Sequence, residues 1–161
     1  MSPLSFSPRC AAFTVALVLL PAAAAAPTAC DDEGISVSVV AILATDQNDK
    51  VDPKLESIAK EIQKTDPNLK GFRIAVMTKK NIAVGGKDDF DLGGDQSLRV
   101  FVQQKLDKED RYQIKITPPK MGDITYQATC CGRFLPVITP VRNKDGELLI
   151  IGVSVQAAGG K

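Results

Sequence analysis

The chain has 161 residues, with 20 basic and 19 acidic side chains and no histidine. The absence of histidine excludes Ser-His-Asp and Cys-His mechanisms and removes the commonest metal ligand. Charges of both signs are interspersed and no basic stripe carries aromatic residues, which argues against nucleic acid as a partner.

The first 26 residues have the pattern of a secretory signal peptide. Arg9 is the only charged residue there, residues 10–20 are apolar, and Pro21 is followed by five alanines that suit cleavage. No later apolar run is long enough to cross a membrane, so we expect no integral membrane segment after cleavage. The chain beyond residue 26 is expected to hold an acidic tether at 27–34, a single domain at 35–157 and a tail at 158–161.

The domain is expected to begin with a strand, a helix and a second strand. Residues 35–44 alternate at first and then become apolar on both faces, which is typical of a buried strand. Asp52 and Pro53 suit the N-cap and first position of a helix. The apolar stripe of that helix has the spacing i, i+3, i+4 and i+7 and consists of Leu55, Ile58, Ala59 and Ile62. A second strand follows at 72–79, and a parallel pairing with the first strand would make a β-α-β crossover.

A short strand at 82–84 and a glycine-rich loop at 85–95 are expected next. The glycines of this loop argue against regular structure. Four aspartates in it are weak candidates for a calcium site, because clustered carboxylates suit a hard cation: Asp88, Asp89, Asp91 and Asp95. The spacing does not match an EF-hand, and a solvated turn is the favoured interpretation. The same carboxylates in one loop are a poor basis for glycoside hydrolysis.

From residue 97 onward the pattern alternates in the manner of half-buried antiparallel strands. Three such strands are expected, around 98–103, 112–117 and 124–130, with reversals at 107–110 and 118–122. The overall prediction is an α+β fold made mostly of antiparallel β-sheet, or a β-sandwich, with one N-terminal helix.

A β-hairpin is expected to close the domain. Residues 134–142 and 147–156 are rich in Val, Ile and Leu, and Asp145-Gly146 between them suits a tight turn. The second run is apolar on both faces, which predicts a central strand. The first run carries Pro136 and Pro140, which cannot donate to a ladder, so it is expected at an edge.

Three cysteines remain after signal cleavage, Cys30, Cys130 and Cys131, and they have neither zinc-site nor redox-motif spacing. Adjacent cysteines in a strand point to opposite faces, so a Cys130–Cys131 bond is disfavoured. We expect Cys30 to pair with one of the two and the other thiol to be buried. As an alternative, residues 27–30 resemble an imperfect lipobox, which would make Cys30 a lipidation site.

These features predict a small exported domain without catalytic activity or cofactor, located in the periplasm, the cell envelope or the extracellular space. A structural or binding role is expected, with a protein or another envelope component as the partner. Two alternatives remain open: a thiol-based redox or soft-metal activity at Cys130 and Cys131, and a calcium-dependent binding module.

Overall fold

A computed structural model describes residues 34–106 and 110–158. The chain divides into two compact units, Met1–Cys30 and Asp31–Lys161, and every described residue belongs to the second. The predicted signal peptide therefore lies outside the described residues, as does Cys30. The elements of the described part, in chain order, are β1 (Gly34–Thr45), the 3₁₀ turn η1 (Pro53–Leu55), α1 (Glu56–Thr65), β2 (Gly71–Ala83), β3 (Lys87–Gly93), β4 (Gln96–Lys105), β5 (Arg111–Thr117), β6 (Ile124–Thr129), β7 (Leu135–Arg142) and β8 (Leu148–Ala157).

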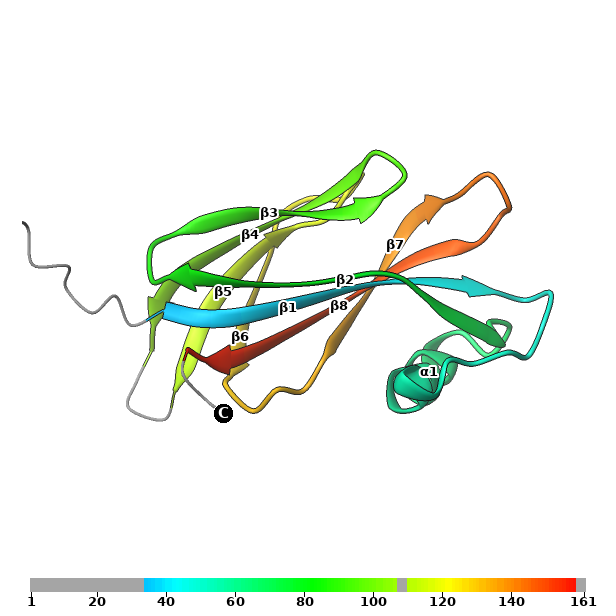
Figure 1. Cartoon of the computed structure of the whole chain (residues 1–161), viewed down its shortest axis with the longest axis horizontal. Coiled ribbons are helices and arrows are strands. Elements are labelled where there is room, and N and C mark those ends of the chain that lie inside the picture. The colour runs from blue at the N-terminus through cyan, green and yellow to red at the C-terminus, as the bar shows by residue number, and fades with distance from the viewer. Residues whose placement is uncertain (1–33, 107–109, 159–161) are drawn as a thin grey trace, which may run out of the picture. The chain divides into compact units, whose positions relative to one another are not determined.

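The eight described strands form two antiparallel four-stranded sheets. Sheet A has the order β2-β1-β8-β7, and sheet B has the order β3-β4-β5-β6. The sheets pack against each other around one apolar core, and α1 packs on the opposite face of sheet A (Figure 1). This arrangement confirms the prediction of a mostly antiparallel α+β fold with one N-terminal helix.

Sheet A is buried on both faces at its centre. In β8, Leu148 and Ile150 belong to the core beneath α1, whereas Leu149, Ile151 and Val153 belong to the core between the sheets. Gly152 leaves room for the Phe134 ring to pack on the strand. A Cβ at this position would lie only 3.3 Å from that ring. The predicted central position of this strand is confirmed, since β8 lies between β1 and β7.

The helix begins as its sequence predicts. The Asp52 carboxylate accepts a hydrogen bond from the Lys54 backbone N–H at 3.0 Å, and Pro53 opens the following 3₁₀ turn. All four residues of the predicted stripe are at most 5% exposed: Leu55, Ile58, Ala59 and Ile62. Their burial contributes roughly 1.5–3 kcal/mol for each large aliphatic side chain and attaches the helix to sheet A.

The second strand pairs differently from the parallel crossover considered above. β2 runs antiparallel to β1, with Thr45 opposite Gly71 and Gly34 opposite Ala83. The helical connection leaves and re-enters sheet A at the same end, where Lys70 N–H donates to the Thr45 carbonyl at 2.9 Å. The chain must therefore return along β1. β2 also continues to Ala83, so the separate short strand predicted at 82–84 is the end of β2.

The glycine-rich segment predicted to be a loop is largely a strand. β3 occupies Lys87–Gly93 and pairs with β4 from Lys87 opposite Phe101 to Gly93 opposite Gln96. Its glycines lie at its two ends: Gly85 at φ +82° precedes it, and Gly93 and Gly94 turn the chain into β4. Phe90 and Leu92 anchor β3 because both are buried in the core between the sheets.

The closing hairpin has the predicted turn at Gly146, whose φ is +79°. β7 is an edge strand, as its two prolines predict. The β7–β8 register shifts between Ile138 and Arg142, and Thr139 bridges the gap. The Thr139 hydroxyl donates to the Leu149 carbonyl at 2.7 Å and accepts from the Val141 N–H at 3.2 Å.

Candidate functional site

A shallow groove of about 670 Å³ crosses the outer face of sheet B, on the side away from the core. Strands β3, β4 and β5 form its floor, and the β2–β3 turn and the β5–β6 loop form its sides. The residues that line it are Gly85, Gly86, Lys87, Arg99, Phe101, Lys115, Thr117 and Asp123.

One aromatic ring lies between two lysines in the floor of this groove. The strand register places Lys87 opposite Phe101 and Phe101 opposite Lys115, so the three side chains form one row across β3, β4 and β5. They point outward, because the alternate residues Val100 and Val102 are fully buried in the core. The Phe101 side chain is half-buried, and the Lys115 ammonium lies 5.9 Å from the centre of its ring.

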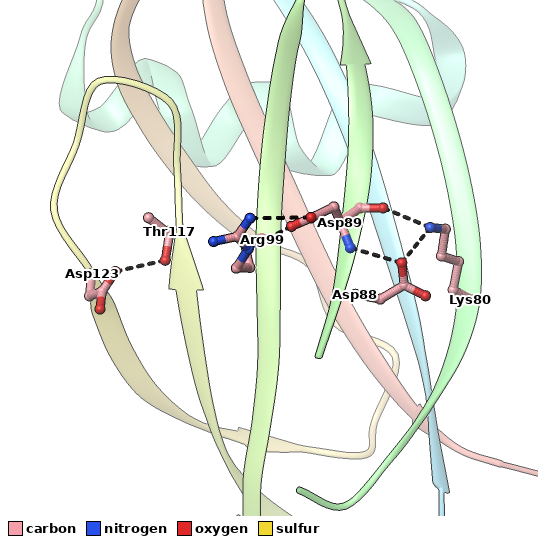
Figure 2. Close-up of polar contacts among 6 residues, drawn as sticks. All are labelled: Lys80, Asp88, Asp89, Arg99, Thr117 and Asp123. Carbon is pink, nitrogen blue, oxygen red and sulfur yellow. Dashed lines mark hydrogen bonds and ion pairs between the residues drawn. The ribbon is translucent and has the colours of Figure 1, made fainter. Parts of the chain in front are cut away.

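Arg99 lies next to this row and is held by Asp89 of the neighbouring strand. Its Nε donates to Asp89 Oδ1 at 2.8 Å and its Nη2 donates to Oδ2 at 3.3 Å, which makes a two-pronged pair (Figure 2). This hydrogen bonding lowers the pKa of Asp89 and raises the pKa of Arg99. The guanidinium is therefore fixed in direction while its Nη1 has no partner among the described residues.

Asp123 fixes the opposite side of the groove. The Thr117 hydroxyl donates to Asp123 Oδ1 at 2.7 Å, and Lys115 Nζ lies 3.0 Å from Oδ2. The Thr117 hydrogen bond, followed by the Lys115 contact, lowers the pKa of Asp123. Lys115 is thus restrained by a carboxylate on one side and by the Phe101 ring on the other.

A lysine of sheet A connects the two sheets at β3, the edge strand of sheet B. Lys80 Nζ, from β2, lies 2.6 Å from Asp88 Oδ1 and 2.6 Å from the Asp89 carbonyl oxygen (Figure 2). The same ammonium lies 5.1 Å from the centre of the Phe90 ring. Lys87, in contrast, makes no hydrogen bond or close ion pair with the residues that the structure describes, so its charge is available to a ligand.

The four aspartates considered for calcium are not gathered around one point. Because β3 is a strand, Asp88 faces the opposite side from Asp89 and Asp91, and Asp95 lies beyond the strand in the turn at φ +61°. Asp88 and Asp89 are paired with Lys80 and Arg99, and Asp91 Oδ1 accepts from the Gly93 N–H at 2.7 Å. Within residues 34–106 and 110–158, no group of three or more acidic or cysteine side chains could hold a metal ion.

The two adjacent cysteines follow β6 in a bend and are not part of the strand, which was expected to reach residue 130. Cys130 is half-buried against the core between the sheets and Cys131 is exposed, and the two sulfur atoms are not bonded to each other. Burial raises the pKa of Cys130, and the nearby Asp110 carboxylate raises it further. A raised thiol pKa lowers the thiolate fraction and hence the reactivity of Cys130. The predicted bond to Cys30 involves a residue outside the described part of the chain.

The sequence interpretation did not single out the residues that line the groove. The signal was present in the alternation of β4, where Arg99 and Phe101 fall between buried Leu98, Val100 and Val102. The lysine on β3 has no such signal, because the glycines of residues 85–95 indicate a loop, so the row Lys87–Phe101–Lys115 does not follow from the sequence.

No known protein family, curated protein or solved structure matches the chain in sequence or fold. No helix in the described part is both long and apolar enough to cross a membrane.

Proposed function

We propose that this protein is an exported, non-catalytic binding domain whose groove on sheet B binds an acidic saccharide. The observation that carries the proposal is the row of Lys87, Phe101 and Lys115 across three strands, with Arg99 beside it. A structural role in the envelope is compatible with such binding, because a domain that holds an acidic polymer also anchors itself to it.

Phe101 favours a ligand that contains a ring with an apolar face. Phe101 is half-buried in the floor of an open groove, so one part of its ring remains available for stacking. The C–H face of a sugar ring can cover this surface while its hydroxyl groups reach the polar side chains at the sides. Binding sites commonly combine an apolar or aromatic surface with a few fixed polar groups in this way.

The charges favour an acidic sugar over a neutral one. Three cations surround the ring. Arg99 and Lys115 have carboxylate partners, Asp89 and Asp123, whereas Lys87 has none among residues 34–106 and 110–158. The unpaired Lys87 can bind a sugar carboxylate as a point charge, and Arg99 Nη1 can donate a second, charge-assisted hydrogen bond.

The carboxylates that flank the groove make it rigid before any ligand arrives. Asp89 holds Arg99 through two hydrogen bonds, and Asp123 is held by both Thr117 and Lys115. Ordering a long side chain on binding costs roughly 0.5–1.5 kcal/mol, so restraint in the free protein increases affinity. The same carboxylates provide acceptors for sugar hydroxyl groups.

Export is supported by the signal pattern at residues 1–26. We expect the mature N-terminus to lie between Ala23 and Cys30. Intact-mass measurement of the exported protein tests this expectation. A species that begins at Met1 would contradict export, and a diacylglycerol mass increment on Cys30 would identify a lipoprotein.

Calorimetric titration with two oligosaccharides of equal length tests the binding proposal. Tetragalacturonate carries a carboxylate on each sugar and is expected to bind; cellotetraose carries none and is expected to bind at least about tenfold more weakly, a difference of about 1.4 kcal/mol. The affinity for the acidic ligand should fall with added salt, since exposed charges are screened.

Four variants locate the interaction. Phe101→Ala should weaken tetragalacturonate binding about tenfold or more, and Phe101→Trp should retain it because stacking survives. Lys87→Gln should weaken binding, whereas Lys144→Gln, an exposed lysine in the β7–β8 turn, should not. Absence of binding, or equal affinity in all variants, would refute the proposal.

A further inference from the structure

A second cavity, of about 390 Å³, opens at the end of the sandwich where the β3–β4 and β7–β8 turns lie. It is separate from the groove on the outer face of sheet B and shares no lining residue with it. Both sheets contribute to it: β1, β2, β7 and β8 from sheet A, and β3 and β4 from sheet B.

The inner walls of this cavity are aliphatic. Five of its lining residues are members of, or pack against, the core between the sheets: Leu43, Val76, Leu92, Val141 and Leu149. Leu92, Val141 and Leu149 are at most 7% exposed, so they form the closed inner part. The cavity is an extension of the core that remains open to one side.

Glycine keeps the entrance open on the sheet B side. Gly93 and Gly94 turn β3 into β4 with φ of +83° and +60°, and a Cβ on Gly93 would lie 3.5 Å from a Val76 methyl group. A larger residue at Gly93 would both strain the turn and narrow the cavity.

The charged residues that line the cavity are both arginines. Arg73 comes from β2, and Arg142 comes from the end of β7. Arg142 Nη1 donates to the Gly146 carbonyl oxygen at 2.7 Å, which directs its side chain toward the turn without neutralising its charge. Arg73 pairs with Glu147, which lies outside the cavity lining, through Nε at 2.9 Å and Nη2.

We infer that this cavity binds a single-chain aliphatic carboxylate, with the alkyl chain between the sheets and the carboxylate at Arg142. Two features carry the inference together: an aliphatic interior continuous with the core, and an entrance at which both charged side chains are cationic. The volume lies at the lower end of the usual range for ligand sites, about 300–1,000 Å³, which suits one chain. Transfer of the alkyl chain from water into the cavity is favourable, and the arginine selects the anion over a neutral head group.

Titration with laurate and with dodecanol, both below the concentration at which they aggregate, tests this inference. The two ligands share an alkyl chain and differ in the charge of the head group. Methyl NMR signals of Val76, Leu92 and Leu149 should shift on addition of laurate. Dodecanol should bind about tenfold more weakly, because the charge-assisted hydrogen bond is missing.

Variants separate the cavity from non-specific adsorption. Arg142→Gln should weaken the binding of laurate about tenfold and leave the affinity for dodecanol unchanged. The control is Arg133→Gln, which replaces an exposed arginine paired with Glu61 on α1 and should alter neither affinity. Val76→Phe should fill the cavity and abolish the binding of both ligands. Because Arg142 is exposed, its variant remains informative even if Val76→Phe fails to fold.

Equal affinities for laurate and dodecanol, unchanged methyl signals, or an Arg142→Gln variant that binds laurate normally would each overturn the inference. Tetragalacturonate should not compete with laurate. The two sites can therefore fail independently.

Discussion

At the scale of single residues, Gly146 shows how one backbone angle fixes the closing hairpin. Its φ of +79° is readily accessible to glycine and strained for a β-branched residue. A Cβ there would meet nothing within 4 Å, so any effect of substitution comes from the backbone alone. We expect Gly146→Val to destabilise the fold by about 1–3 kcal/mol.

Chemical denaturation measures that loss. Gly122→Val is the matched control, since this glycine also has open space around it and lacks the positive φ. Equal unfolding free energies for the two variants would place the origin of the effect elsewhere.

The Arg73–Glu147 pair predicts a pH dependence of stability. The Glu147 side chain is only 15% exposed, and the hydrogen bond from Arg73 lowers its pKa below the ordinary 4.5. A carboxylate with a lowered folded-state pKa stabilises the protein above its unfolded pKa and loses that contribution as the pH falls through its folded pKa. Wild-type stability should therefore fall more steeply below pH 4.5 than that of Glu147→Gln.

Denaturation midpoints at neutral pH and at acidic pH values below 4.5 test this expectation. Arg73→Gln should flatten the pH profile in the same way, and the double variant should add little. Parallel profiles for wild type and Glu147→Gln would contradict the account.

At the scale of elements, the edge strand β7 depends on one side chain that replaces lost backbone pairing. Thr139 is 2% exposed, and its hydroxyl bonds both the Leu149 carbonyl and the Val141 N–H across the register shift. Thr139→Val keeps the shape and leaves these two backbone groups without that partner. We expect the free energy of unfolding to fall by about 1–3 kcal/mol.

Thermal or chemical unfolding of this variant can be compared with Thr125→Val on β6, where the side chain is exposed. A loss confined to Thr139→Val is the expected result. Equal stability of both variants would show that the bridge across the shift is dispensable.

The elements that could be predicted from sequence are those with a complete local signal. β8 has apolar residues on both faces, which predicts its central position. α1 has a cap and a four-residue apolar stripe, which predict where the helix begins and which face it buries. β7 has two prolines, which predict its edge position. The pairing direction of β2 was not, because it depends on where the connection returns to sheet A. β3 was missed because its terminal glycines obscured the alternation of Phe90 and Leu92.

The candidate site could be predicted only in part for the same reason. The outward residues of β4 are visible in the alternation, but a groove requires the register between β3, β4 and β5. That register is a long-range property, set by which residues the core buries. The four aspartates that are close in sequence are divided between the two faces of β3 and the turn that follows it.

At the scale of the whole molecule, the three cysteines allow one specific disulfide to be predicted. Cys131 is exposed and Cys130 is half-buried, so we expect Cys131 rather than Cys130 to pair with Cys30. Closing a loop of about 100 residues contributes up to roughly 4–5 kcal/mol in the chain-entropy model. Peptide mapping without reduction should find the Cys30 peptide crosslinked to the peptide that contains Cys131.

Replacement by serine identifies the partner. Cys131→Ser should abolish this crosslink and Cys130→Ser should leave it intact. Free or acylated Cys30, together with a bond between Cys130 and Cys131, would remove the basis for a structural disulfide and favour the thiol-based activity instead.

The groove on sheet B is the basis of the proposed function, and an NMR titration of the ¹⁵N-labelled domain with tetragalacturonate tests it most directly. We expect saturable shifts of amide signals on β3, β4 and β5, centred on Lys87, Arg99, Phe101 and Lys115, while the signals of α1 and β7 stay unchanged. Signals that do not move, or that move mainly outside sheet B, would contradict it.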